Sequence, residues 1–158
     1  MLRLHYELRA DPEQVRIPAR APGGGRADRL WAHTCFEAFI QAEGSAAYLE
    51  LNFSPSGEWA AYRFDSYRQG MVAAELQEPP RMALRRAGDR LELEAEARLG
   101  EAWPAGGPAA LGGGVRIGVS AVVEDRHGRL SYWALRHPPG RPDFHHPHGF
   151  SLALNTAQ

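Results

Sequence analysis

The sequence predicts an all-β protein that folds as an antiparallel β-sandwich, with residues 1–158 forming a single domain. Three observations support this fold class. Apolar and polar residues alternate with a period of two in nearly every segment, the alternating runs are short, and Gly- and Pro-rich turns separate them at regular intervals. No segment has a convincing helical period. A chain of 158 residues with 44% apolar content has the size and composition of one domain with a real core.

Composition excludes several classes of function. The formal net charge of −1 provides no global field that would attract nucleic acid or an anionic membrane. The single cysteine excludes an internal disulfide framework. The first ten residues alternate and lack the apolar run of a signal peptide, and no stretch approaches the length of a membrane span. We therefore expect a cytoplasmic protein. Its basic residues are all arginine, which is typical of a GC-rich bacterial genome.

Four strands are expected in the first half of the chain. The first has apolar residues at every second position and therefore one solvent-exposed face, and a long connection rich in Pro, Gly and Arg follows it. The next three are separated by Glu43-Gly44-Ser45 and by a tight turn with Pro55 second and Gly57 fourth. These three should form an antiparallel meander. The expected strands are residues 2–8, 30–42, 47–53 and 58–67.

The second half repeats this style with five further strands. The first two should form a hairpin, and the third alternates strongly. Residues 69–78 could hold a helical turn, while residues 100–114 and 138–148 read as Gly- and Pro-rich loops. The expected strands are residues 81–86, 90–99, 115–123, 130–136 and 150–154.

Each strand of the meander has one apolar face and one mixed face, because side chains two apart share a face. Joined mixed faces would form a patch of Glu37, Glu50, Asn52, Arg63 and Asp65, framed by His33, Trp59 and Tyr48. One alternative is a solvated sheet face with cross-strand ion pairs. Aromatic residues, a cysteine and a histidine are unusual on such a face, and asparagine is unfavourable inside a strand. We therefore expect a pocket in which Glu37 is shielded from solvent and Arg63 is its best partner.

Three stretches carry a family resemblance when taken together. They are "LWAHTCFEAFI" at residues 30–40, "YLELNFSPSGEWAAYRFDSY" at 48–67 and "LSYWALRHPPGRPDFHHPHGFSLAL" at 130–154. They resemble the bacterial DOMON-like proteins, which are relatives of the family 9 carbohydrate-binding modules. The resemblance implies an immunoglobulin-like β-sandwich that holds a sugar or a haem on one sheet and has no enzymatic activity.

The chain departs from these relatives in two places. His33-Thr34-Cys35 stands where the relatives carry an aspartate. Sugar-binding members hold the ring between two tryptophans, for which Trp59 and Trp133 are the candidates and Trp31 is the third. The predicted function is non-catalytic binding of a carbohydrate or sugar-like ligand, without a cofactor and without a nucleic-acid or membrane partner. The oligomeric state stays open. The expected ligand-binding residues are Glu37, Glu50, Asn52, Arg63, Trp59, Trp133 and His33.

Other kinds of site are weaker alternatives. The "DFHHPHG" segment offers weak metal candidates, of which two histidines could share a side, but a loop cluster without metal is favoured. Haem would need Met71 or Met82, and neither lies in a recognisable motif. An enzyme is the runner-up class, with Glu37 and Glu50 as paired carboxylates or with the His33–Cys35 pair as an activated thiolate. The weak metal candidates are Asp143, His145, His146 and His148.

Overall fold

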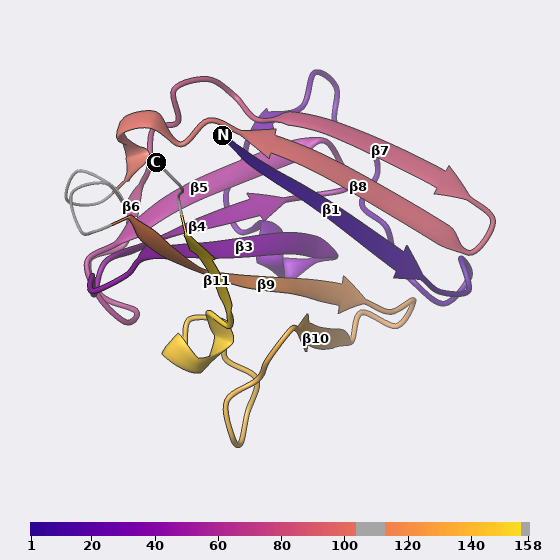
Figure 1. The fold of residues 1–158 in the computed structure, drawn as a ribbon. Coiled ribbons are helices and arrows are strands. Elements are labelled where there is room, and N and C mark those ends of the chain that lie inside the picture. Colours follow the sequence, from indigo (N-terminus) through magenta and orange to yellow (C-terminus); the bar gives the residue numbers. More distant parts are fainter. Residues whose placement is uncertain (104–112, 156–158) are drawn as a thin grey trace.

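The computed structural model describes residues 1–103 and 113–155 and consists of two facing sheets (Figure 1). The all-β sandwich predicted from the sequence is confirmed, and no α-helix occurs in the described residues. The small sheet has the order β1–β8–β7, with bounds Leu2–Arg9, Arg90–Ala97 and Arg81–Ala87. The large sheet has the order β10–β9–β3–β4–β5–β2, with β11 beside β9 and β6 beside β5. Its bounds are Leu130–Ala134, Gly114–Glu124, Cys35–Ala42, Tyr48–Phe53, Glu58–Phe64, Gly25–Arg26, Leu152–Asn155 and Val72–Ala73. Neighbouring strands are antiparallel in both sheets, except that β2 runs parallel to β5.

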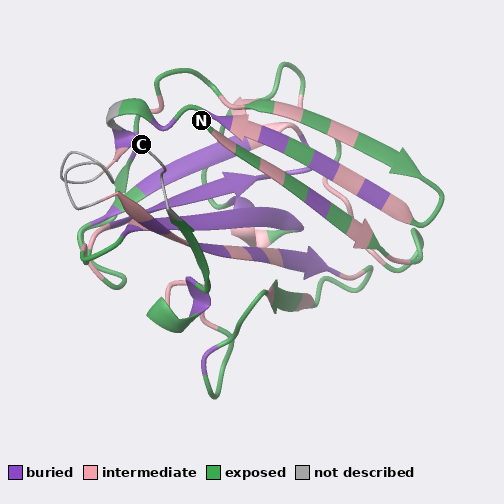
Figure 2. Ribbon diagram, viewed as in Figure 1, coloured by how far each residue is buried: buried purple, intermediate pink, exposed green. Residues whose placement is uncertain are grey.

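The small sheet keeps one face in solvent, as its alternating sequence predicts. Figure 2 shows this sheet as strands banded in alternating burial classes. Leu91 and Leu93 of β8 point into the core, while charged side chains on the outer face form ion pairs such as Arg3–Glu96 at 2.8 Å. This pattern is the usual one for an antiparallel sheet that is covered on one side only.

The central strands of the large sheet are buried on both faces, and Figure 2 shows β3, β4 and β5 almost uniformly buried. One face carries Phe36, Leu51 and other side chains into the core against the small sheet. On the opposite face a second apolar cluster includes Leu30 and Phe150, which belong to chain segments outside the central strands. The alternative of a solvated sheet face is therefore wrong.

The pairing confirms the predicted meander and the predicted hairpin. Strand β3 pairs with β4, and β4 pairs with β5, both antiparallel, and β7 pairs with β8 in the same way. The tight turn between β4 and β5 is also as expected. Gly57 N–H donates to the Ser54 carbonyl at 3.0 Å, and Gly57 has a φ of 89°, which favours glycine.

Three expectations about local structure need correction. The expected strand 30–42 begins only at Cys35, because Leu30–Ala32 forms a 3₁₀ turn (η1) after Arg29, whose φ is 59°. The possible helical turn at 69–78 is instead the short strand β6, which pairs with the edge of β5. The expected loop 100–114 begins with the 3₁₀ turn η2, Gly100–Ala102, and residues 104–112 of it lie outside the described residues.

The connection from β10 to β11 covers the second face of the large sheet. It includes the 3₁₀ turn η5, Pro147–Gly149. Phe150 stacks on Phe39 of β3 with ring centroids 6.0 Å apart, and Phe144 lies 6.4 Å from the same ring. In Figure 1 this connection and the small sheet lie on opposite sides of the large sheet. Within the described residues, no helix is long and apolar enough to cross a membrane.

Candidate functional site

The pairing of β3 with β4 brings the polar residues of the covered face together. Glu37 lies directly opposite Asn52, and Phe39 lies opposite Glu50. Residues that face each other across an antiparallel pair point to the same side. The register thus joins Glu37, Asn52 and Glu50 in one cluster beneath the β10–β11 connection. Their exposed fractions are 3%, 0% and 5%.

Strand β5 contributes the opposite set of side chains from the one expected. Tyr62 lies opposite Glu50 and Ala60 opposite Asn52, so Tyr62, Ala60 and Phe64 share the polar cluster's face. Trp59 and Arg63 therefore lie on the other face, and their expected place beside Glu37 is wrong. The sequence pattern had grouped the polar residues of β5 with those of β4, whereas the register across the turn groups its aromatic residues with them.

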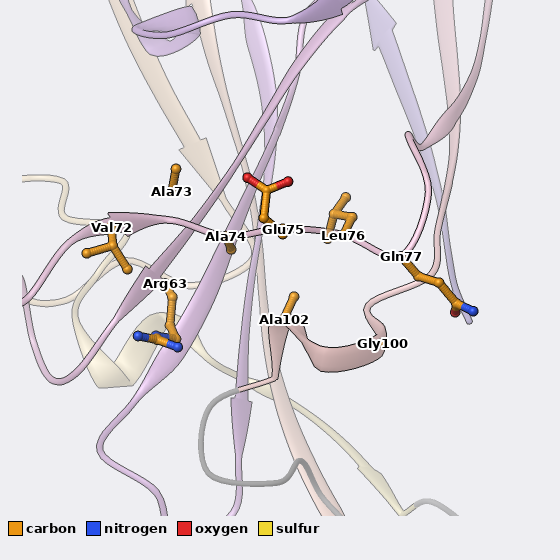
Figure 3. A pocket seen from close by; sticks show the side chains of 9 residues that line it. All are labelled: Arg63, Val72, Ala73, Ala74, Glu75, Leu76, Gln77, Gly100 and Ala102. Atoms are coloured by element: carbon orange, nitrogen blue, oxygen red, sulfur yellow. The ribbon is translucent and has the colours of Figure 1, made fainter.

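The structure shows what Trp59 and Arg63 do instead. Trp59 is buried in the core between the sheets, and the Arg26 guanidinium lies 4.7 Å from its ring centre. Arg63 is exposed and lines a separate cavity of about 640 Å³, together with residues of the 72–77 segment (Figure 3). Glu75 also lines that cavity, but 87% of its side chain is exposed. Asp65 lies just after β5 and is exposed.

A cavity of about 450 Å³ opens over the polar cluster, and Glu37 and Glu50 line it. Its walls are largely aromatic and come from distant parts of the chain. They are supplied by Trp31 of η1, Phe64 of β5, Tyr132 of β10 and Phe144 of the β10–β11 connection. Such a cavity, with apolar walls and a few convergent polar groups, has the size and character of a small-molecule site.

Two polar side-chain atoms of this site have no hydrogen-bond partner among the residues that the structure describes. Asn52 Nδ2 donates to Glu50 Oε1 at 2.8 Å, which occupies one oxygen of Glu50. Glu37 Oε1 and Asn52 Oδ1 are buried without a hydrogen-bond partner in the described part of the chain. Buried polar atoms are nearly always paired, so unpaired acceptors beside a cavity mark a place where a donor from water or from a ligand can bind.

The two carboxyl groups hold their protons more tightly than exposed glutamates do. Burial, followed by the charge of Glu50, raises the pKa of Glu37 well above its usual value. Burial also raises the pKa of Glu50 to about 7, although the hydrogen bond from Asn52 opposes the change. Removing a carboxylate from water disfavours its charged form, and no cation is paired with Glu37 Oε1 in the described residues.

A hydrogen-bond network fixes the rim of the cavity. The Arg68 guanidinium donates to Asp143 Oδ1 at 2.8 Å, and the Tyr67 hydroxyl donates to Asp143 Oδ2. The Arg68 backbone N–H donates to the Tyr48 hydroxyl at 3.2 Å, and Tyr48 lies 2.8 Å from His145 Nδ1. This network ties the turn after β5 to the β10–β11 connection.

His145 faces Glu50 as a neutral side chain at neutral pH. Burial, followed by the charge of Arg68, lowers its pKa to about 4. Burial also raises the pKa of Tyr48 to about 12. The Tyr48 hydroxyl and His145 Nδ1 lie 2.8 Å apart, and the tautomer of His145 decides which of the two donates. On the other side of the ring, His145 Nε2 lies 3.8 Å from Glu50 Oε2.

Two expected site residues lie away from the Glu37 cavity. Trp133 is 62% exposed and lines an apolar groove of about 590 Å³ that includes residues of β1 and β9. It lies opposite Ala121 of β9, whereas its neighbour Tyr132 lies opposite Val122 and lines the Glu37 cavity. His33 does not line the cavity, and its Nδ1 lies 2.7 Å from Glu124 Oε2.

The weak metal candidates do not converge on one point. Asp143 forms an ion pair with Arg68, and the His145 ring packs against the Phe39 ring in a T-shaped arrangement. The rings of His146 and His148 do lie close together, with centroids 4.6 Å apart. In the described ranges, no three His, Cys, Asp or Glu side chains are arranged to hold a metal ion.

The residues proposed for haem or for thiolate chemistry are dispersed. Met71 lines the cavity, but Met82 lies on β7 and packs against the core between the sheets. Cys35 is fully buried, and burial raises the pKa of its thiol, which makes it a poor nucleophile.

The cavity residues that the sequence did not place at the site come from several separate segments of the chain. Trp31 was the third tryptophan considered, and it lies in the wall with its ring 5.7 Å from Tyr62. Tyr132, Phe144 and Arg68 gave no signal as ligand-binding residues. Alternation along β10 does indicate that Tyr132 and Trp133 face opposite ways, but it does not say which of them meets Glu37.

No protein-family model matches the chain, and no curated protein matches it. A crystal structure from Bacteroides uniformis ATCC 8492, provisionally assigned as a carbohydrate-binding protein, does match, with a TM-score of 0.60 at 20% identity. The match covers 97% of this chain and 72% of that chain. At this level of identity the likeness shows the fold alone: the chain is similar to that protein in its all-β sandwich.

Proposed function

We propose that the protein binds a carbohydrate or sugar-like ligand, without catalysis, in the cavity over Glu37, Glu50 and Asn52. The observation that carries this proposal is the unpartnered buried acceptor Glu37 Oε1 in an aromatic-walled cavity, with a second unpartnered acceptor, Asn52 Oδ1, directly opposite it on β4. A sugar presents several hydroxyl donors and an apolar C–H face in one small molecule. The hydroxyls would satisfy the acceptors, and an aromatic wall would receive the C–H face.

Trp31 and Tyr132 are the proposed stacking residues, in place of Trp59 and Trp133. Both line the cavity, and Tyr132 contacts Phe144 with ring centroids 6.0 Å apart. The assignment of the Bacteroides protein as carbohydrate-binding supports the proposed ligand class. Membership of the DOMON-like or family 9 carbohydrate-binding group, a bacterial origin and a cytoplasmic location remain predictions from the sequence.

We expect Trp31→Ala to abolish much of the binding energy for any sugar that the protein selects. A glycan array of neutral, acidic and amino sugars identifies the probe, and calorimetry with the strongest hit measures the variant. Loss of a wall residue should weaken binding by about 2 kcal/mol, as is typical of a buried aromatic contact.

Glu37→Gln should weaken binding of the same sugar by about 1.5–3 kcal/mol, as for a hydrogen bond to a charged group, measured by the same calorimetry.

Trp133→Ala is the matched control, because Trp133 is exposed in a different groove. Its affinity should equal that of the wild type, and all three variants should melt cooperatively. Equal losses in Trp31→Ala and Trp133→Ala would move the site to another surface. An array without a single hit would refute the sugar proposal.

A carbohydrate-active enzyme is the second candidate, and the carboxyl pair is the observation that favours it. A carboxyl group with a pKa of about 7, as in Glu50, is suited to act as a general acid beside a second carboxyl group. Incubation with mixed oligosaccharides and aryl glycosides separates the two proposals. Turnover that Glu50→Gln abolishes would establish the enzyme.

A further inference from the structure

More acidic than basic side chains line the cavity over Glu37, and this imbalance restricts which ligands the cavity can bind. Of the described residues that line it, Arg68 is the one permanent cation, and Arg68 is paired with Asp143 at 2.8 Å. The charge of Arg68 still acts on Glu50, whose pKa it lowers, but it is not among the causes that shift the pKa of Glu37. Among the described residues that line the cavity, Glu37 therefore has no cation of its own. His145 does not supply one, since its pKa of about 4 leaves it neutral at neutral pH.

The two carboxyl groups differ in how far their surroundings satisfy them. Glu50 accepts a hydrogen bond from Asn52 at 2.8 Å, and His145 Nε2 lies 3.8 Å away. Glu37 Oε1 has no partner in the described chain, although its residue is only 3% exposed. Asn52 Oδ1, directly across the strand pair, is a second unpartnered acceptor. Glu37 with Asn52 is thus the subsite that lacks donors.

We infer that the ligand carries a cationic amino group beside its hydroxyl groups, and is therefore an amino sugar whose ammonium is received by Glu37 and Asn52 Oδ1. This inference rests on the proposed function and narrows its substrate class. An ammonium group supplies three donors and a positive charge at once. Two unpartnered acceptors on neighbouring strands leave room for several donors, and the charge of an ammonium group also favours the ionised form of Glu37, which burial disfavours. A neutral hydroxyl supplies a single donor and does not favour ionisation of Glu37.

The walls fit the same ligand. Trp31, Tyr132 and Phe144 surround the acidic base with aromatic faces. Aromatic faces attract organic cations, and their apolar surface also packs against the C–H face of a pyranose. A sugar with an amino substituent uses the acidic base and the aromatic walls together.

The test compares matched sugar pairs by calorimetry at neutral pH. The pairs are glucosamine with glucose, galactosamine with galactose, and mannosamine with mannose, with the N-acetylated forms as uncharged controls. In at least one pair the amino member should bind about tenfold tighter or more, which is about 1.4 kcal/mol. N-acetylation should remove that advantage, because it removes the charge and two of the donors.

Glu37→Gln locates the subsite. It keeps the shape of the side chain and removes the charge, so the two members of the selected pair should then bind within about twofold of each other. Glu75→Gln is the matched control, because Glu75 is an exposed glutamate that lines the separate cavity of Figure 3. This control should keep the full preference for the amino member. Thermal melting checks that both variants are folded.

Affinity as a function of pH is a second readout. The titratable groups around Glu37 are Cys35 on its own strand, Glu50 on β4, Tyr6 from the small sheet, Arg68 from the turn after β5, and Asp143 and His145 from the β10–β11 connection. Ionisation of the two glutamates creates the negative charge that the ammonium needs. Amino-sugar affinity should therefore rise as the pH increases towards about 7, the pKa of Glu50, while the ammonium group stays protonated. The affinity of a neutral sugar should not rise.

The outcomes separate this inference from the proposed function. If the neutral member of a pair binds as tightly as the amino member, the amino-sugar inference is overturned and carbohydrate binding stands. If Glu37→Gln keeps the amino preference, the ammonium lies elsewhere and the assignment to Glu37 is overturned. If no member of any pair and no array glycan binds, the proposed function fails, and the inference fails with it.

Discussion

Phe39→Ala is expected to lower the free energy of unfolding by about 3–5 kcal/mol, as for other fully buried phenylalanines. Phe39 is 1% exposed, and it lies on β3 beneath the cover of the cavity. Its ring contacts Phe150, Phe144 and His145, at centroid distances of 6.0, 6.4 and 5.1 Å. Removing it leaves a void at the point where the β10–β11 connection is anchored to the large sheet.

Urea denaturation followed by tryptophan fluorescence measures this loss. Hydrogen exchange should also show that amides of residues 143–150 lose protection before those of β3 and β4, because the cover loses its anchor first. Phe39→Leu is the control, since it keeps most of the volume and should cost less than about 1.5 kcal/mol. A loss below about 1 kcal/mol in Phe39→Ala would mean that the cover does not depend on this contact.

Glu50→Gln is expected to stabilise the protein at alkaline pH and to have little effect at acidic pH. In the unfolded chain a glutamate has a pKa near 4.5, whereas burial raises the pKa of folded Glu50 to about 7. The folded state therefore retains a proton that the unfolded state has released. The contribution of Glu50 to stability is fully present below pH 4.5 and is lost as the pH rises through 7. A shift of this size corresponds to about 3 kcal/mol.

Glutamine does not titrate, and its carbonyl oxygen can still accept from Asn52 Nδ2. The stability difference between variant and wild type should therefore grow from near zero at about pH 4 to about 3 kcal/mol at about pH 8, measured by urea denaturation at each pH. His145 acts in the opposite direction, because its lowered pKa costs stability as the pH falls from 6.5 through 4. That term is present in both proteins and largely cancels in the difference.

Glu75→Gln again serves as the control, since Glu75 lines a separate cavity and 87% of its side chain is exposed. A constant difference between Glu50→Gln and wild type across this pH range would contradict the prediction. It would show that Glu50 titrates as an ordinary glutamate, with water or an ion compensating its burial.

The sequence by itself determined the elements and their local pairing. Alternation with a period of two identified β1, β9 and the hairpin of β7 with β8, and the turn at 54–57 made β4 and β5 antiparallel neighbours. These features depend on residues close in the chain, where periodicity and turn chemistry act directly. The pattern also singled out Glu37 as a carboxylate on a strand that would not face open solvent, and its burial is confirmed.

The tertiary structure decided which residues meet above Glu37. Shifting the register of a strand by one residue exchanges all of its side chains between the two faces of the sheet. The sequence pattern of β5 did not show which of its side chains lie on the same face as Glu37. The register brought Tyr62 and Phe64 to the site and sent Arg63 and Trp59 to the other face. Alternation is also a weak guide in strands that are buried on both sides, because both faces then tolerate apolar residues.

The cover of the cavity depended on contacts between residues far apart in the chain. His145 lies 97 residues from Tyr48 and hydrogen-bonds to it, and Asp143 lies 75 residues from Arg68 and pairs with it. Local propensity contains no information about such contacts, because they join the β10–β11 connection to strands and turns that are far away in the sequence. The sequence therefore placed a carboxylate on the strand, and the tertiary fold built a cavity around it by closing that face of the sheet with aromatic side chains.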